Sequence, residues 1–108
     1  MIYIASPYSH QLDSVRYERF TLARAYAHHL MAQGRVCFSP IAYGRQFEKV
    51  FSVAPDHETW MDFNNWMLLA SQDVHVLKLD GWLQSRGVTH EIALANDHGI
   101  PVSYVEPV

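Results

Sequence analysis

The segment from Ser85 to Glu91 brings a hydroxyl, a glycine and a carboxylate together at the predicted start of a helix. In a helix that begins near Gly87, Glu91 shares a face with Val88 and Ala95, and this face should pack on a sheet. An ionised carboxylate there is costly unless hydrogen-bond donors or a cation meet it. Ser85, Gly87 and the free N–H groups of the helix start could also bind an anion. The segment predicts either a reactive carboxylate beside an anion site or a solvent-exposed glutamate at the margin of the apolar stripe.

Strand and helix patterns alternate along the chain. Strands are predicted at 1–5, 35–40, 73–79 and 100–105, and helices at 13–33, 57–71 and 87–98, with Asp13 as the N-cap of the first helix. Residues 41–57 show neither pattern and are predicted to form an irregular, mobile loop with a helical turn before Pro55. We therefore expect one α/β domain over 1–108, a Rossmann- or flavodoxin-like three-layer fold with a four- to five-stranded, mostly parallel sheet.

Three loops should meet at one edge of this sheet. They are "ASPYSH" at 5–10, "SPIAYG" at 39–44 and "DGWLQSRG" at 80–87, and each follows a predicted strand. Ligands of open parallel sheets bind outside the carboxyl ends of the strands, where such loops gather. A site should therefore be assembled from these loops and the helix starts behind them.

Composition and charge narrow the classes of partner. Of the 108 residues, 49% are hydrophobic, which is enough to fold a domain, and the formal net charge of −3 argues against sequence-independent binding of nucleic acid. The only cysteine, Cys37, cannot form an intramolecular disulfide, which suits a reducing cytoplasm. Residues 1–8 contain no basic leader and only a short apolar run, so we expect a cytoplasmic protein without a signal peptide or membrane span.

The sequence lacks the motifs of several chemistries that are common in α/β proteins. The seven histidines have no paired spacing of the zinc kind, so no metal is expected. The chain contains no serine nucleophile elbow, Walker motif or GxGxxG pattern, and no cofactor is expected. Asp80 could be imagined as the phospho-acceptor of a receiver domain, but such a domain needs acidic residues where Ser6 and Pro7 stand. A small-molecule partner fits better.

Three stretches of the chain resemble the nucleoside 2-deoxyribosyltransferase-like superfamily, most closely its small DUF1937 branch. They are "IYIASPY", "GRVCFSPIAYG" and "DVHVLKLDGWLQSRGVTHEIALANDHGIPV". The most specific element, Ser85-x-Gly87-Val88-x-x-Glu91, is similar to the motif of the 2'-deoxynucleoside 5'-phosphate N-hydrolases. The resemblance implies hydrolysis or transfer at the N-glycosidic bond of a (deoxy)nucleoside 5'-monophosphate.

The same resemblance implies roles for individual residues. Glu91 would be the nucleophile at the anomeric carbon, and Ser85 with Gly87 would hold the 5'-phosphate. Relatives that use free nucleosides have an aspartate at the serine position, which would repel a phosphate dianion. Where relatives supply an acidic proton donor this chain has Asn65, and an amide cannot act as a general acid. Asp62, about one turn earlier on the predicted helix, could substitute for it.

Four further residues could contact the substrate, three of them by likeness to relatives and Arg19 by its place in the first predicted helix. Tyr3 and Ser6 correspond to positions of the first loop that contact sugar or phosphate in relatives. Arg19 lies in the early turns of the first predicted helix, where it could reach a phosphate or remain solvated. Tyr43 lies in the loop with which relatives wall in the base by stacking.

Two other classes of function stay open. The chain could be a non-catalytic nucleotide-binding or sensor module, which Asn65 favours, or a structural or partner-binding accessory protein in which Glu91 is packed or solvated. A homo-oligomer, either a dimer or a tetramer, is expected for two reasons. Relatives complete their sites from a neighbouring subunit, and three tryptophans and six tyrosines are many for a chain this short.

Overall fold

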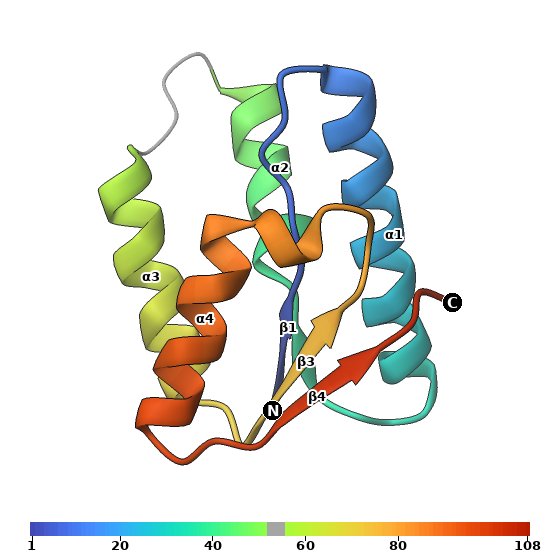
Figure 1. The fold of residues 1–108 in the computed structure, drawn as a ribbon. Coiled ribbons are helices and arrows are strands. Elements are labelled where there is room, and N and C mark those ends of the chain that lie inside the picture. Colours follow the sequence, from blue (N-terminus) through green and yellow to red (C-terminus); the bar gives the residue numbers. More distant parts are fainter. Residues whose placement is uncertain (52–55) are drawn as a thin grey trace.

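A computed structural model describes residues 1–51 and 56–108 (Figure 1). The elements in chain order are β1 (Ile2–Ala5), α1 (Asp13–Ala32), β2 (Cys37–Phe38), α2 (Pro40–Val50), α3 (His57–Leu69), β3 (Asp73–Leu77), the short 3-10 helix η1 (Trp82–Gln84), α4 (Arg86–Asp97) and β4 (Val102–Val105). The strands form one sheet in the order β2-β1-β3-β4, and every neighbouring pair is parallel. None of the helices in these two stretches is long and apolar enough to cross a membrane.

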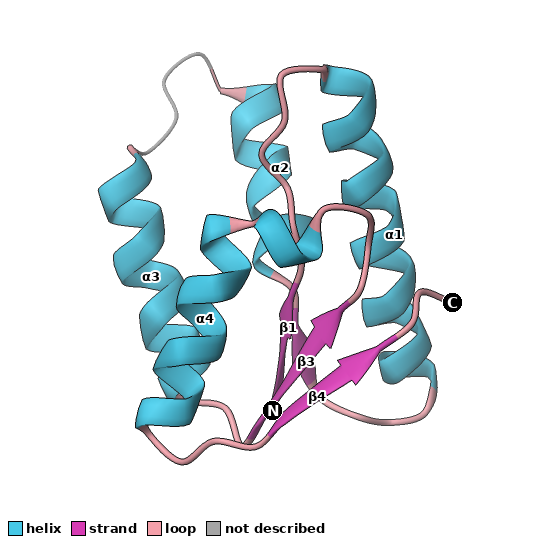
Figure 2. Cartoon of the chain, viewed as in Figure 1, coloured by secondary structure: helices cyan, strands magenta, loops and turns pink. Residues whose placement is uncertain are grey.

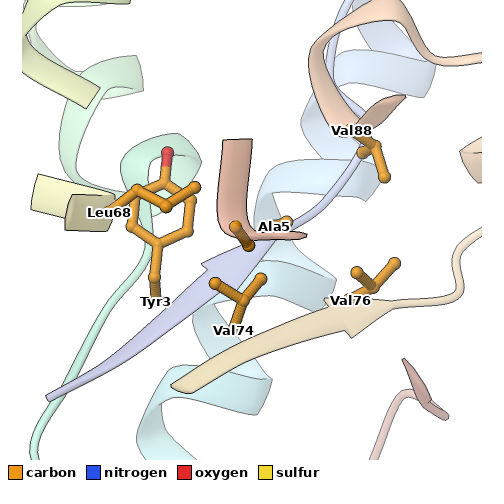
Figure 3. Close-up of a cluster of buried hydrophobic side chains, with 7 residues drawn as sticks. Tyr3, Ala5, Leu68, Val74, Val76 and Val88 are labelled. Atoms are coloured by element: carbon orange, nitrogen blue, oxygen red, sulfur yellow. The ribbon is translucent and has the colours of Figure 1, made fainter. Parts of the chain in front are cut away.

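Helices cover both faces of the sheet and make three layers, which confirms the predicted α/β fold (Figure 2). One core cluster joins β1 and β3 to α3 and α4, and its buried members are Tyr3, Ala5, Leu68, Val74, Val76, Val88 and Ala95 (Figure 3). A second cluster lies on the α1 side, and its buried members are Ile2, Ile4, Tyr26, Leu30, Leu77 and Leu79. Alternate residues of a strand face opposite sides, so the central strand β1 is apolar at every position.

The strand order reverses between β1 and β3. From β1 the chain passes through α1 to β2, and it then returns through α2 and α3 to β3 on the other side of β1. This is the strand order of flavodoxin-like sheets, whose ligands bind at the carboxyl ends of the strands where the order reverses. Ser6 directly follows β1, and Gly81 and Ser85 lie between β3 and α4, so all three residues border this place.

The prediction of an irregular loop at 41–57 is wrong for residues 41–50, because Pro40–Val50 forms α2. Ser39 is the N-cap, and its hydroxyl accepts a hydrogen bond from the Ala42 N–H at 3.1 Å. A Ser-Pro pair that ends a strand can also start a helix, since proline suits the first helical turn. The second strand is accordingly shorter than predicted and spans only Cys37–Phe38. Residues 52–55, with the turn expected before Pro55, lie outside the described residues.

The prediction that Asp13 caps α1 is also wrong. The helix begins at Asp13 itself, and Leu12 occupies the N-cap position without a side-chain capping bond. The Asp13 carboxylate instead contacts Lys49 at 2.8 Å, Arg45 at 3.3 Å and Arg16 at 3.4 Å. The hydrogen bond from Lys49, followed by the charge of the nearby cations, lowers the pKa of Asp13 below its ordinary value. The Asp13 carboxylate therefore links α1 to α2 through ion pairs and does not cap the helix.

Leu30 and Met31 offer a matched test of the α1 face of the core. Leu30 is 1% exposed, whereas Met31, its neighbour in α1, is 64% exposed. We expect Leu30→Ala to lower the free energy of unfolding by about 2–5 kcal/mol and Met31→Ala by less than about 0.5 kcal/mol, as measured by urea denaturation. Equal losses would contradict the packing of α1 described above.

Candidate functional site

A cavity of about 870 Å³ lies at the carboxyl ends of β1 and β3, between the loops that follow these strands and the helices α2, α3 and α4. Its volume falls in the range of about 300–1,000 Å³ that is typical of small-molecule sites. Residues predicted from the sequence that line it are Ser6, Arg19, Asn65, Ser85, Gly87 and Glu91. Lining residues that the sequence did not single out include Tyr8, Arg45, Glu48, Trp60 and His90.

Glu91 lies where α4 meets the core. Val88 and Ala95 on the same helix face are fully buried, as the spacing predicts. The hydroxyl of Tyr3, a fully buried side chain of β1, donates a hydrogen bond to Oε2 of Glu91. Burial raises the pKa of Glu91 to about 7, and the hydrogen bond from Tyr3 opposes this rise. The carboxyl group that faces the cavity is therefore present in both its acidic and its ionised form near neutral pH.

Tyr3 is a fixed donor rather than an acid. Burial, and next the negative charge of Glu91, hold the pKa of its phenol well above the ordinary value. The ring belongs to the core cluster between the sheet and α3–α4, with its hydroxyl directed out of that cluster (Figure 3). The sheet thus orients the Glu91 carboxylate through Tyr3.

The start of α4 offers free donors to the cavity. Ser85 is the N-cap, and its Oγ accepts from the Val88 N–H at 3.2 Å, which leaves the hydroxyl proton for a ligand. The N–H groups of Arg86 and Gly87 have no acceptor in the part of the chain that the structure describes. A Cβ added at Gly87 would meet only Ser85 Oγ, at 3.9 Å, so this side of the helix start is open. The Ser6 hydroxyl lines the same cavity and has no hydrogen-bond partner among the described residues, although Ser6 is only 6% exposed.

Arg19 joins the loop after β1 to the loop after β3. Its guanidinium donates to the backbone carbonyls of Ser9 at 2.9 Å, Tyr8 at 3.4 Å and Asp80 at 3.0 Å. Within residues 1–51 and 56–108 it forms no ion pair, so its positive charge is available to an anion in the cavity. Gly81 has a φ of 89°, and a Cβ there would lie 2.7 Å from Nη2 of Arg19. The positive φ favours glycine here, and a Cβ would push the Arg19 guanidinium from its present place.

Asn65 and His90 meet between α3 and α4. Oδ1 of Asn65 lies 3.0 Å from Nε2 of His90, and both residues line the cavity. The structure does not bring Asp62 to this cavity. Asp62 is exposed and borders a smaller hollow of about 350 Å³ together with Trp66 and Leu69. Asp62, which we expected could replace Asn65 as the proton donor, therefore lies outside the cavity.

Tyr8, Arg45 and Glu48 form a polar wall that the sequence did not predict. The Tyr8 hydroxyl donates to Glu48 at 2.6 Å and accepts from Arg45 at 3.0 Å. Burial and the Glu48 carboxylate raise the pKa of Tyr8 to about 12. Arg45 is only 7% exposed and lies over the rings of Tyr17 at 5.3 Å and Phe20 at 5.6 Å. No spacing signal marks these contacts, because they join α2 to α1 and to the loop after β1.

Trp60 of α3 lines the cavity, whereas Tyr43 is not among the lining residues. Tyr43 is 41% exposed, and its ring stacks on Phe63 with 5.6 Å between ring centres and 9° between planes. It also packs edge-on against Phe47 and Trp60. Tyr43 therefore supports Trp60 from the side, and Trp60 stands where the sequence led us to expect Tyr43.

Together, the parallel sheet and the cavity at its switch point define a small flavodoxin-like α/β protein whose cavity lies where such sheets bind their ligands. A family model described as "Domain of unknown function (DUF1937)" matches residues 1–106, so the chain belongs to the DUF1937 family. This match confirms the DUF1937 part of the resemblance. No curated protein shows a significant match to the sequence.

Glu91→Gln should stabilise the fold in a pH-dependent way. Burial raises the pKa of Glu91 from 4.5 to about 7. Ionising this carboxyl group therefore costs more free energy in the folded protein than in the unfolded chain. The protonated carboxyl group makes its full contribution to the free energy of unfolding below pH 4.5. This contribution is lost as the pH rises through about 7. Near pH 8 the free energy of unfolding of the glutamine variant should exceed that of the unaltered protein by on the order of 2–3 kcal/mol.

The measurement is thermal or urea unfolding across this pH range. Near pH 4 the two proteins should have nearly the same stability, since the glutamate is then neutral in both states. A gap between them that is constant with pH would contradict the raised pKa of Glu91.

Gly81→Ala should cost more stability than Gly34→Ala. Both glycines have positive φ, 89° and 75°, but a Cβ at Gly34 meets nothing within 4 Å, whereas one at Gly81 meets Arg19. We expect a loss of about 1–2 kcal/mol at Gly34 from the left-handed backbone alone, and a clearly larger loss at Gly81, by urea denaturation. Equal losses would mean that Arg19 does not hold its contact with this loop.

Proposed function

We propose that this DUF1937 protein cleaves or exchanges the N-glycosidic bond of a (deoxy)nucleoside 5'-monophosphate, with Glu91 as the nucleophile. One observation carries the proposal. A largely buried carboxylate, oriented by Tyr3, faces a cavity that also contains the free donors of the α4 start. The similarity of the Ser85–Glu91 segment to the motif of the 2'-deoxynucleoside 5'-phosphate N-hydrolases supports the same reaction.

The donors near the α4 start suit a phosphate. Ser85 and Ser6 supply hydroxyl groups, the Gly87 N–H is unpaired among the described residues, and Arg19 adds a positive charge. The N-terminus of α4 attracts anions through its free N–H groups and its dipole. Since Ser85 has no negative charge to repel a dianion, a nucleoside 5'-monophosphate should be preferred over a free nucleoside.

The reaction would follow the course of a retaining glycosidase. An ionised oxygen of Glu91 attacks the anomeric carbon through an oxocarbenium-like transition state and forms a glycosyl ester. Water, or a second nucleobase, then attacks the same carbon and releases Glu91. Tyr3 contributes by holding the carboxylate in one orientation and by stabilising its ionised form.

A nucleotide-binding module without turnover is the second candidate. Asn65 favours it, because an amide stands where relatives supply a proton donor and Asp62 does not line the cavity. The donors of Ser6, Ser85 and Gly87 would serve binding equally well. The two candidates differ only in whether the nucleobase is released.

We also propose that the chain assembles as a homo-oligomer. Trp66 is 78% exposed and Leu69 43% exposed on α3, and Phe63 of the same helix is 36% exposed. Large apolar side chains gathered on one helix of a small protein are typical of an interface between subunits.

The test incubates the protein with a panel of deoxynucleoside 5'-monophosphates and the matching nucleosides, and follows free base by chromatography. We expect faster release from the monophosphates than from the nucleosides. Glu91→Gln should reduce release by at least about a thousandfold, because the ester can no longer form. On the acidic side of its pH profile, kcat/KM should rise with pH through about 7, as Glu91 ionises.

The matched control is Glu18→Gln, which removes an exposed carboxylate of α1 and should leave the rate unchanged. Binding of a monophosphate without release of base, in a folded sample, would favour the sensor. If Glu91→Gln changes neither affinity nor turnover, the chain is an accessory protein and the proposal is wrong.

A further inference from the structure

His90 is held at the cavity beside the reactive carboxylate. It directly precedes Glu91 in α4, and both residues line the cavity. Its Nε2 lies 3.0 Å from Oδ1 of Asn65 in α3. An amide oxygen can only accept, so Nε2 carries the hydrogen of this bond and Nδ1 is the nitrogen left for a ligand. Asn65 thereby fixes both the orientation and the tautomer of the ring.

We propose that His90 is the catalytic residue that donates a proton to the leaving nucleobase, with Asn65 as its positioning residue. This inference rests on the proposed glycosyl chemistry. A nucleobase leaves as a high-energy anion unless one of its ring nitrogens is protonated, so breaking the bond needs an acid as well as a nucleophile. Imidazole is the side chain best suited to give up a proton and take it back near neutral pH. Asn65, which cannot donate this proton, supports the residue that does.

Other groups near the cavity do not fit this task. Burial and Glu48 raise the pKa of Tyr8 to about 12, so its phenol is too weak an acid. Glu48 itself accepts the Tyr8 hydrogen bond at 2.6 Å. Asp62 does not line the cavity. His57 lines it from the first residue of α3, but no side-chain hydrogen bond with another described residue orients its ring.

The protons and electron pairs balance over two steps. In the first step an oxygen of Glu91 forms a bond to the anomeric carbon, and the carbon–nitrogen bond breaks with its electron pair going to the nucleobase. The imidazolium of His90 transfers one proton to the nucleobase and becomes neutral. In the second step water attacks the anomeric carbon, its proton returns to His90, and the electron pair of the ester bond returns to Glu91. The protein ends as it began.

Two substrates with different leaving groups test this role in the full chain. One is a deoxynucleoside 5'-monophosphate, and the other has nitrophenol in place of the nucleobase on the same sugar phosphate. Nitrophenolate is a weak base and leaves without a proton. We expect His90→Gln to slow release of the nucleobase by about 10²- to 10⁴-fold and to leave release of nitrophenol nearly unchanged. His98→Gln, just beyond the C-terminal end of α4, is the matched control and should change neither rate.

The outcomes separate this inference from the proposed function. Equal loss for both leaving groups in His90→Gln, or no loss for either, overturns the role of His90. Release of nitrophenol but not of nucleobase by the unaltered protein also overturns it, while the glycosidic chemistry stands. Release of neither by the unaltered, folded protein overturns the proposed function and the role of His90 with it.

A double variant tests proton donation directly. Adding Asn65→Asp to His90→Gln puts a carboxyl group at the position that holds the ring in the unaltered protein. We expect nucleobase release to recover in part, because a carboxylic acid can donate the missing proton. Recovery would support a chemical role for His90. Loss of nitrophenol release in both variants would instead mark the α3–α4 contact as structural and overturn the inference.

Discussion

The hydrogen bond from Tyr3 to Glu91 connects the hydrophobic core to the cavity, and the proposed chemistry depends on it. Tyr3 is enclosed by the cluster that includes Leu68 and Val88, so the direction of its hydroxyl is set by the packing of the sheet against α3 and α4. The same packing buries Glu91 and raises its pKa. A carboxylate kept partly neutral by burial lowers the stability of the fold at higher pH, and this is a common cost of reactive groups.

The part of the cavity beside the start of α4 depends on two loops that are far apart in the chain. The pairing of β1 with β3 brings their carboxyl ends together, and Arg19 then joins the loops through the carbonyls of Ser9 and Asp80. Gly81 permits this contact because any side chain there would meet the guanidinium. The helix start that follows keeps its donors free, since Ser85 uses its hydroxyl oxygen, rather than its proton, to cap the helix.

Much of the fold was predictable because it follows from local periodicity. The apolar runs around Ile4 and Cys37 predict strands, and the single long helix that connects them predicts that they are parallel, as observed. Spacing alone put Glu91 on the helix face of Val88 and Ala95, but it left open whether the carboxylate is reactive or solvent-exposed. The helix after Pro40 was missed because the Ser-Pro pair was taken only as a strand end, and Asp13 was misassigned because its ion pairs involve residues of another helix.

The sequence by itself determined the four strands, the three helices α1, α3 and α4 and the spacing from Ser85 to Glu91, because these depend on residues within a few positions of one another. Only the tertiary structure decided which polar side chains share the cavity. It paired His90 with Asn65 and left Asp62 outside. These contacts join residues of different helices, and their geometry follows from how those helices pack on the sheet, which no local pattern encodes.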